Sequence, residues 1–224
     1  MLRKVIFVAI CVFLLTSVIS YLMYRAAISG PKFYRDLTTE SRSDARQLGD
    51  QLESAILELH NSAVRENEWS LEVTDQEINA WLVAYLPRKY PLQNPDSITD
   101  PRVKIADDEI KLAFRVKSER FPFVVCIHVE PFITSDGNNI GLSFSKAYIG
   151  ILPLGKKRIV EQLSSAASKI DIPIGWTQDK NGPIAMLSPQ IKLAKQLERK
   201  IEIKSIKVMG SSLYLSGIAS DSSE

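Results

Sequence analysis

The sequence has few of the side chains that most enzymes and metal sites use. Its 224 residues include only two cysteines and two histidines. Cys11 lies in the first apolar run and Cys126 in a predicted strand, so a bond between them would need one sulfur to leave the membrane. We therefore expect no disulfide, and cysteine usage indicates no redox compartment. His60 and His128 have no partner at metal-ligand spacing such as H-x-x-x-H or C-x-x-C.

The chain also lacks an excess of charge of one sign and lacks catalytic motifs. Its 28 basic and 26 acidic residues give a net charge of +2, and the basic residues are spread along the chain. This balance argues against a nucleic-acid partner. No G-x-S-x-G motif, phosphate loop, zinc-finger spacing or internal repeat is present. We expect a non-catalytic protein without a cofactor.

One local cluster is the best candidate for catalysis or metal binding. Cys126, His128 and Glu130 alternate along a predicted strand and so share one face. The competing interpretation is a polar strand face with mixed residues. We favour the second, because local clusters seldom supply a whole site, and we predict no catalytic and no metal-binding residues.

The N-terminal apolar run predicts a membrane anchor. Residues 5–24 form 20 consecutive positions without a charge, preceded by Arg3 and Lys4 and followed by Arg25. At about 1.5 Å per residue, this run spans the roughly 30 Å hydrocarbon layer. The residues predicted to lie in the membrane anchor include Val5, Phe7, Leu14, Leu15 and Tyr24.

A cleaved signal peptide is the alternative for the same run. Signal peptides have an apolar region of about 7–15 residues, and this run is longer. We therefore predict an uncleaved anchor that crosses the cell membrane once. The basic flanks are nearly balanced, but a short N-terminal tail usually stays inside, so we expect the main domain outside the cytoplasm.

The remaining sequence divides into segments with different patterns. The predicted boundaries are 1–30 for the cytoplasmic tip and anchor, 31–66 for a linker and an amphipathic helix, 67–218 for an α+β domain, and 219–224 for a disordered tail. The linker covers residues 31–37 and the helix residues 38–66. The apolar stripe of this helix consists of Leu48, Leu52, Ala55, Ile56, Leu59 and Ala63.

A helix start is encoded after residue 73. Thr74 is followed three residues later by Glu77, which is the spacing of a capping box. We interpret Asp75 and Glu77 as helix-capping acids and not as a catalytic carboxylate pair. Pro87 is predicted to end this helix.

Beyond residue 100 the apolar period changes to two, which predicts an antiparallel meander with a hairpin turn at residues 135–139. The strands place one set of apolar side chains on a common face, called here the apolar sheet face: Leu112, Phe114, Phe123, Val125, Ile127, Leu142 and Phe144. This face could line a groove for an acyl chain or form an ordinary core, and periodicity does not distinguish the two. Helices over 156–170 and 188–200 and strands over 201–208 and 213–218 complete the prediction.

The segments "VTDQEINAWLVAYLP", "NNIGLSFSKAYIGILPLG" and "IPIGW", in this order after an anchor and a helix, resemble the YpmS-type family of single-pass bacterial membrane proteins. The resemblance covers roughly residues 1–190. It also extends to a looser group of exported domains, some of them lipid-carrier-like, with a curved antiparallel sheet around a long helix. Together with the segments above, it predicts an α+β fold in which a transmembrane helix precedes a curved antiparallel sheet packed with three to four helices.

Two functions follow as expectations. The first is a membrane-anchored domain that binds a membrane lipid or another hydrophobic ligand outside the cytoplasm. The second is a scaffold module that docks on another envelope protein. Lys156, Lys157 and Arg158 either face lipid headgroups or form a solvated basic turn.

Overall fold

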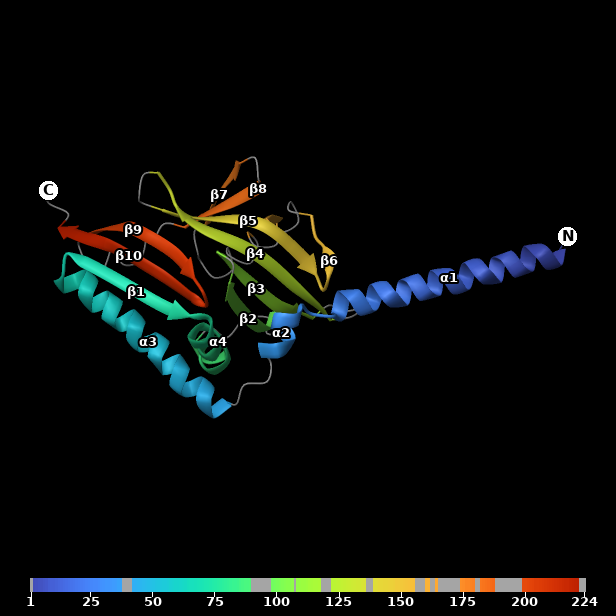
Figure 1. The fold of residues 1–224 in the computed structure, drawn as a ribbon, viewed down its shortest axis with the longest axis horizontal. Helices are drawn as coiled ribbons and strands as arrows, with labels where there is room; N and C mark the ends of the chain where they lie inside the picture. Colours follow the sequence, from blue (N-terminus) through green and yellow to red (C-terminus); the bar gives the residue numbers. More distant parts are fainter. Residues whose placement is uncertain are drawn as a thin grey trace.

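A computed structural model describes residues 2–37, 42–89, 98–106, 108–117, 122–135, 139–155, 160–161, 164, 174–179, 182–187 and 199–221. It confirms the predicted α+β class. An apolar N-terminal helix is followed by a large, curved antiparallel sheet that does not close, and by a few helices (Figure 1).

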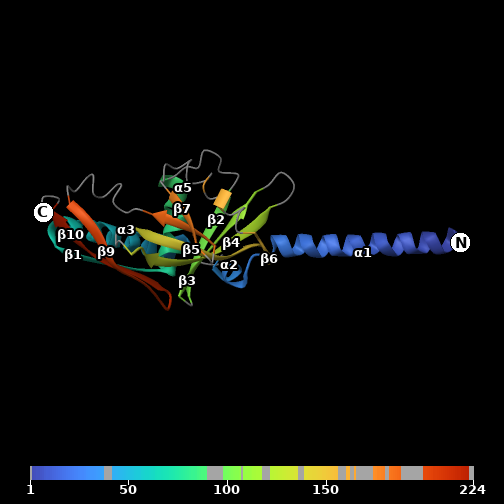
Figure 2. The ribbon, with the colours of Figure 1, turned by 90° about the horizontal axis from the view of Figure 1, so that it is seen from above.

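Helix α1, Leu2–Ile28, projects away from the rest of the molecule in both views (Figures 1 and 2). Its segment Ile10–Ile28 is long and apolar enough to cross a membrane, and only 6% of that apolar window is buried. The anchor residues Phe7, Leu14, Leu15 and Tyr24 have exposed side chains. A helix that is apolar all round, and whose apolar window is almost wholly exposed, has the length and surface of the predicted anchor.

The segment predicted as a linker is a helix instead. Helix α2, Lys32–Asp36, follows α1 after three residues and packs on the sheet. Its Tyr34 is only 2% exposed and forms a cluster with Ala113, Val124 and Cys126. The linker prediction was wrong because the polar residues of this segment surround a tyrosine, Tyr34, whose packing partners are distant in sequence.

Helix α3, Arg42–Arg65, runs along one face of a small sheet (Figure 1). Of its predicted apolar stripe, Leu52 and Ala63 are buried, but Ile56 is 47% exposed. The buried stripe is therefore narrower than the sequence predicts.

The predicted capping box is confirmed at the start of helix α4, Asp75–Ala84. The Glu77 amide donates to the Thr74 hydroxyl at 3.2 Å, and the Thr74 amide donates to Glu77 Oε2 at 2.8 Å. The predicted end was wrong: α4 ends before Tyr85, and Pro87 lies within the short helix α5, Leu86–Lys89.

The small sheet joins the two parts of the chain that are farthest apart in the domain. Its order is β1, Glu68–Thr74, then β10, Ser212–Asp221, then β9, Arg199–Met209, all antiparallel. Ala63 of α3 and Trp69 of β1 pack with Ile201, Ile203 and Ala219. Strand β10 thus includes residues 219–221, which the sequence assigned to a tail, and β9 begins at Arg199, where a helix was expected.

The large sheet is the predicted meander with additions. Its order is β2-β3-β4-β5-β8-β7, and β6 pairs with β5. The strands are β2, Ile98–Ala106; β3, Glu109–Val116; β4, Phe123–Ile133; β5, Ile140–Ile149; β6, Leu152–Pro153; β7, Ile174–Asp179; and β8, Gly182–Leu187. A bulge shifts the β4–β5 register between His128 and Val129.

Several predictions fall on residues that are not described. These are most of the helix at 156–170, of which Val160, Glu161 and Ser164 are helical, the helix at 188–198, the tail at 222–224, and the basic residues Lys156, Lys157 and Arg158.

Candidate functional site

The strands assemble most of the apolar sheet face. Leu112 lies opposite Ile127, and Phe114 lies opposite Val125, across the β3–β4 pair. Phe114, Val125, Ile127, Leu142 and Phe144 belong to one apolar cluster, whereas Leu112 and Phe123 lie outside it. Ile127 and Phe144 are buried, and the other five residues of the face are half-buried.

The sequence did not identify all members of this cluster. Ala147, Leu154, Ala185 and Trp176 also belong to it. The Trp176 and Phe144 rings lie with their centroids 5.6 Å apart and tilted by 33°. Trp176 was visible only as the aromatic end of a short extended segment, because its partner strand β8 adds to the sheet after a long excursion of the chain. Phe114, Val125, Leu142, Leu154 and Trp176 are only half-buried, so part of their apolar surface stays exposed.

The candidate trio of Cys126, His128 and Glu130 does not form a site in the structure. His128 Nδ1 lies 3.0 Å from Glu109 Oε1, and Lys111 Nζ lies 3.2 Å from the same oxygen. Cys126 is 1% exposed, and Glu130 is exposed. Burial raises the pKa of the Cys126 thiol to about 12, so this thiol is protonated at neutral pH.

The partners of His128 form a structural ion-pair cluster. Burial of the Glu109 carboxyl opposes its ionisation, but Lys111 and His128 outweigh burial and hold the pKa of Glu109 below its ordinary value. Among the described residues, no group of three histidine, cysteine, aspartate or glutamate side chains is arranged to hold a metal ion.

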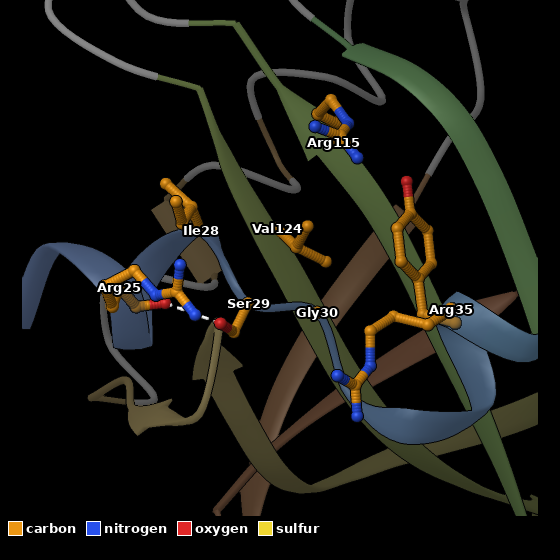
Figure 3. Close-up of a pocket in the computed structure, with 8 residues that line it drawn as sticks. Arg25, Ile28, Ser29, Gly30, Arg35, Arg115 and Val124 are labelled. Atoms are coloured by element: carbon orange, nitrogen blue, oxygen red, sulfur yellow. Dashed lines mark hydrogen bonds between the residues drawn. The ribbon is translucent and has the colours of Figure 1, made fainter.

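A second site lies where α1 meets the sheet, and no sequence pattern indicates it. This junction cavity has a volume of about 330 Å³ and is lined by Arg25, Ile28, Ser29, Gly30, Tyr34, Arg35, Arg115 and Val124 (Figure 3). The lining residues come from the end of α1, from the connection to α2, from α2 itself, and from strands β3 and β4. Residues this far apart in the chain show no common pattern before the fold is known.

The cavity exists because α1 is docked on the turn between β5 and β6. The Ile151 amide donates to the Ala26 carbonyl at 3.1 Å, and the Gly150 amide donates to the Val124 carbonyl at 2.6 Å. Gly150 has a φ of +61°, and a Cβ built there would lie 1.9 Å from the Ala26 oxygen. Only glycine allows this approach, so the helix end and the sheet are held in one arrangement.

Tyr34 closes the other side of the cavity. Its hydroxyl donates to the Asp100 carboxylate at 3.0 Å, and Arg102 pairs with the same carboxylate at 2.6 Å. Burial, and then the Asp100 charge, raise the pKa of Tyr34 to about 12. Because the phenol stays protonated, it donates a fixed hydrogen bond that holds α2 on β2.

Comparison with models of known protein families, with curated proteins and with solved structures finds no match for this chain. The resemblance drawn from the sequence segments therefore stays a prediction.

Proposed function

We propose that this chain is a single-pass membrane protein without catalytic activity, whose domain lies outside the cytoplasm and binds a lipid or similar hydrophobic ligand on the apolar sheet face. The observation that carries the proposal is the docking of α1. The end of the apolar helix contacts the domain directly, because the Ala26 carbonyl accepts a hydrogen bond from the Ile151 amide and lies against Gly150. A helix that crosses the bilayer thus holds the sheet at the membrane surface.

The ligand follows from the composition of the face. Phe114, Val125 and Leu142 are half-buried and apolar, and Trp176 and Phe144 extend the same cluster. Each methylene that leaves water for such a surface gains about 0.8 kcal/mol. An acyl chain with about ten methylenes against the face would gain about 8 kcal/mol before the cost of ordering the chain.

Lipid retention tests this proposal. The full chain would be released from nanodiscs, and native mass spectrometry would record bound lipid. Phe114→Asp places a charge on the apolar sheet face. Lys146→Asp introduces the same side chain at an exposed position of β5, opposite His128 of β4. We expect Lys146→Asp to retain as much lipid as the unaltered chain, and Phe114→Asp to retain less, because only the lipid on the apolar sheet face is lost.

Circular dichroism would show that both variants remain folded. Lipid retention by folded Phe114→Asp that equals that of the unaltered chain would contradict the proposed binding face. The absence of any adduct in the unaltered chain would contradict ligand binding itself.

A second function, docking on another envelope protein, is favoured by one observation on α3. Ile56, Leu57 and Val64 are 47%, 61% and 40% exposed, and their spacing places them on one side of the helix. If α3 is the docking element, Leu57→Glu abolishes co-purification with a specific membrane partner, whereas Glu58→Gln leaves it intact. Equal co-purification of both variants would contradict docking through α3.

A further inference from the structure

We propose that the junction cavity binds a phosphate group, carried either by an anionic lipid headgroup or by free phosphate. The inference rests on the proposed function in one respect: a lipid source requires that α1 crosses the bilayer. The chemistry of the cavity itself does not depend on that.

The side chains that line the cavity carry positive charge. Among the described residues that line the cavity, Arg25, Arg35 and Arg115 are cationic and none is acidic. They come from three different elements, and Figure 3 shows their guanidinium groups distributed around the same space. Arg25 and Arg115 come from two different elements, and their like charges repel one another, so an anion between these two removes an unfavourable interaction.

The Asp100 carboxylate contacts Tyr34, a residue of the cavity wall. Its charge is already balanced by Arg102 at 2.6 Å, and it also accepts the Tyr34 hydroxyl. Asp100 therefore holds the cavity wall in place through Arg102 and Tyr34. The guanidinium group also suits phosphate, because its planar set of donors matches two phosphate oxygens at once.

The cavity lies at the end of the helix segment that is long enough to cross a membrane. Ile28, the last residue of the segment that is long enough to cross a membrane, lines the cavity itself. With α1 in a bilayer, the cavity would lie at the level of the lipid headgroups. Its volume of about 330 Å³ falls at the small end of the range for ligand sites, roughly 300–1,000 Å³, which suits a headgroup.

The charge also predicts which lipid is preferred. Phosphatidylglycerol presents one negative charge, whereas phosphatidylcholine adds a quaternary ammonium that the arginines would repel. A phosphate-binding site lined by arginines would therefore bind phosphatidylglycerol in preference to phosphatidylcholine.

The test has two arms, both on the full chain. In the first arm, the chain is reconstituted with equal amounts of the two lipids, vesicle flotation measures anchoring, and native mass spectrometry measures which lipid is retained. In the second arm, the chain in a phosphate-free detergent is titrated with inorganic phosphate at constant ionic strength while the thermal midpoint is recorded.

Three variants make the first arm specific. Arg115→Gln removes a cavity charge, Arg115→Lys keeps it, and Arg65→Gln removes the same charge from the exposed end of α3. We expect Arg115→Gln to lower the enrichment of phosphatidylglycerol about tenfold, as loss of a hydrogen bond to a charged group does. Arg115→Lys should keep most of the enrichment, and Arg65→Gln should keep all of it.

The outcomes separate the sources. Enrichment that depends on Arg115, without an effect of inorganic phosphate, identifies a lipid headgroup, whereas stabilisation by inorganic phosphate that Arg115→Gln removes identifies free phosphate as a ligand. Enrichment that falls equally in Arg65→Gln, or no effect in either arm, overturns the inference. A chain that fails to float contradicts the anchoring proposal, and the phosphate arm then decides the inference alone.

Discussion

Replacement of Gly150 by alanine tests whether α1 and the sheet form one rigid unit. The φ of +61° at this residue costs about 1–2 kcal/mol for any residue with a Cβ. The added Cβ would also lie 1.9 Å from the Ala26 oxygen, well inside the 3.0 Å that real Cβ contacts respect. The end of α1 must therefore move by about 1 Å, which breaks the hydrogen bond between the Ile151 amide and the Ala26 carbonyl.

The two effects have different consequences. The backbone term lowers the free energy of unfolding of the domain, whereas the lost hydrogen bond, about 0.5–1.5 kcal/mol, weakens the docking of α1 in particular. Trypsin cleavage at Lys32 and Arg35 reports on docking, because a protease needs α2 to leave the sheet. We expect cleavage of Gly150→Ala to be about tenfold faster, the factor that corresponds to 1.4 kcal/mol.

Gly210→Ala is the matched control. Gly210 has a φ of +59°, but a Cβ there would meet nothing within 4 Å. Urea unfolding followed by tryptophan fluorescence should show a similar backbone cost in both variants, and only Gly150→Ala should be cleaved faster. If the two variants are cleaved at the same rate, the rigid junction is refuted.

Three further predictions concern the domain. Asn79→Ala should lower the free energy of unfolding by about 2–3 kcal/mol in urea titration, because the Asn79 side chain is buried and bonds both the amide and the carbonyl of Val103 at 2.8 and 2.7 Å; a loss below about 0.5 kcal/mol would contradict this link between α4 and β2. The pKa of Glu109 is lowered in the folded state, so its contribution to stability is full above the ordinary value of 4.5 and is lost as pH falls through the lower folded pKa. Acid titration of Glu109→Gln should therefore show a smaller loss of stability below pH 4.5 than titration of the unaltered chain. Identical stability profiles would contradict a stabilising ion-pair cluster at Glu109. In vesicles, a water-soluble maleimide at pH 7.5 should modify neither Cys126, which is 1% exposed with a pKa of about 12, nor Cys11, which a bilayer would cover, and rapid modification of Cys11 before denaturation would contradict a membrane-embedded α1.

What the sequence predicted well depends on short-range interactions. The capping box joins Thr74 to Glu77 within one helical turn, and the meander from β2 to β5 follows from alternation and turns. These features are fixed by neighbours in the chain, so local pattern is sufficient to find them.

What the sequence did not predict depends on distant partners. Tyr34 lies in a polar segment, and nothing near it indicates that Asp100 and Val124 bury it. The pairing of β1 with β10 joins both ends of the domain, and no local signal specifies that neighbour. The junction cavity is missed for the same reason, since Arg25 and Arg115 meet only after the sheet has formed.

The most direct test of the account is a map of where lipid tails touch the full chain in vesicles. A phospholipid with a photoactivatable group at the end of one acyl chain would be cross-linked, and the modified peptides would be identified by mass spectrometry. Lipid binding by the sheet predicts cross-links in α1 and also on the apolar sheet face, in the peptides that contain Phe114 and Leu142. Cross-links confined to α1 would contradict lipid binding by the sheet and leave that face as an ordinary core.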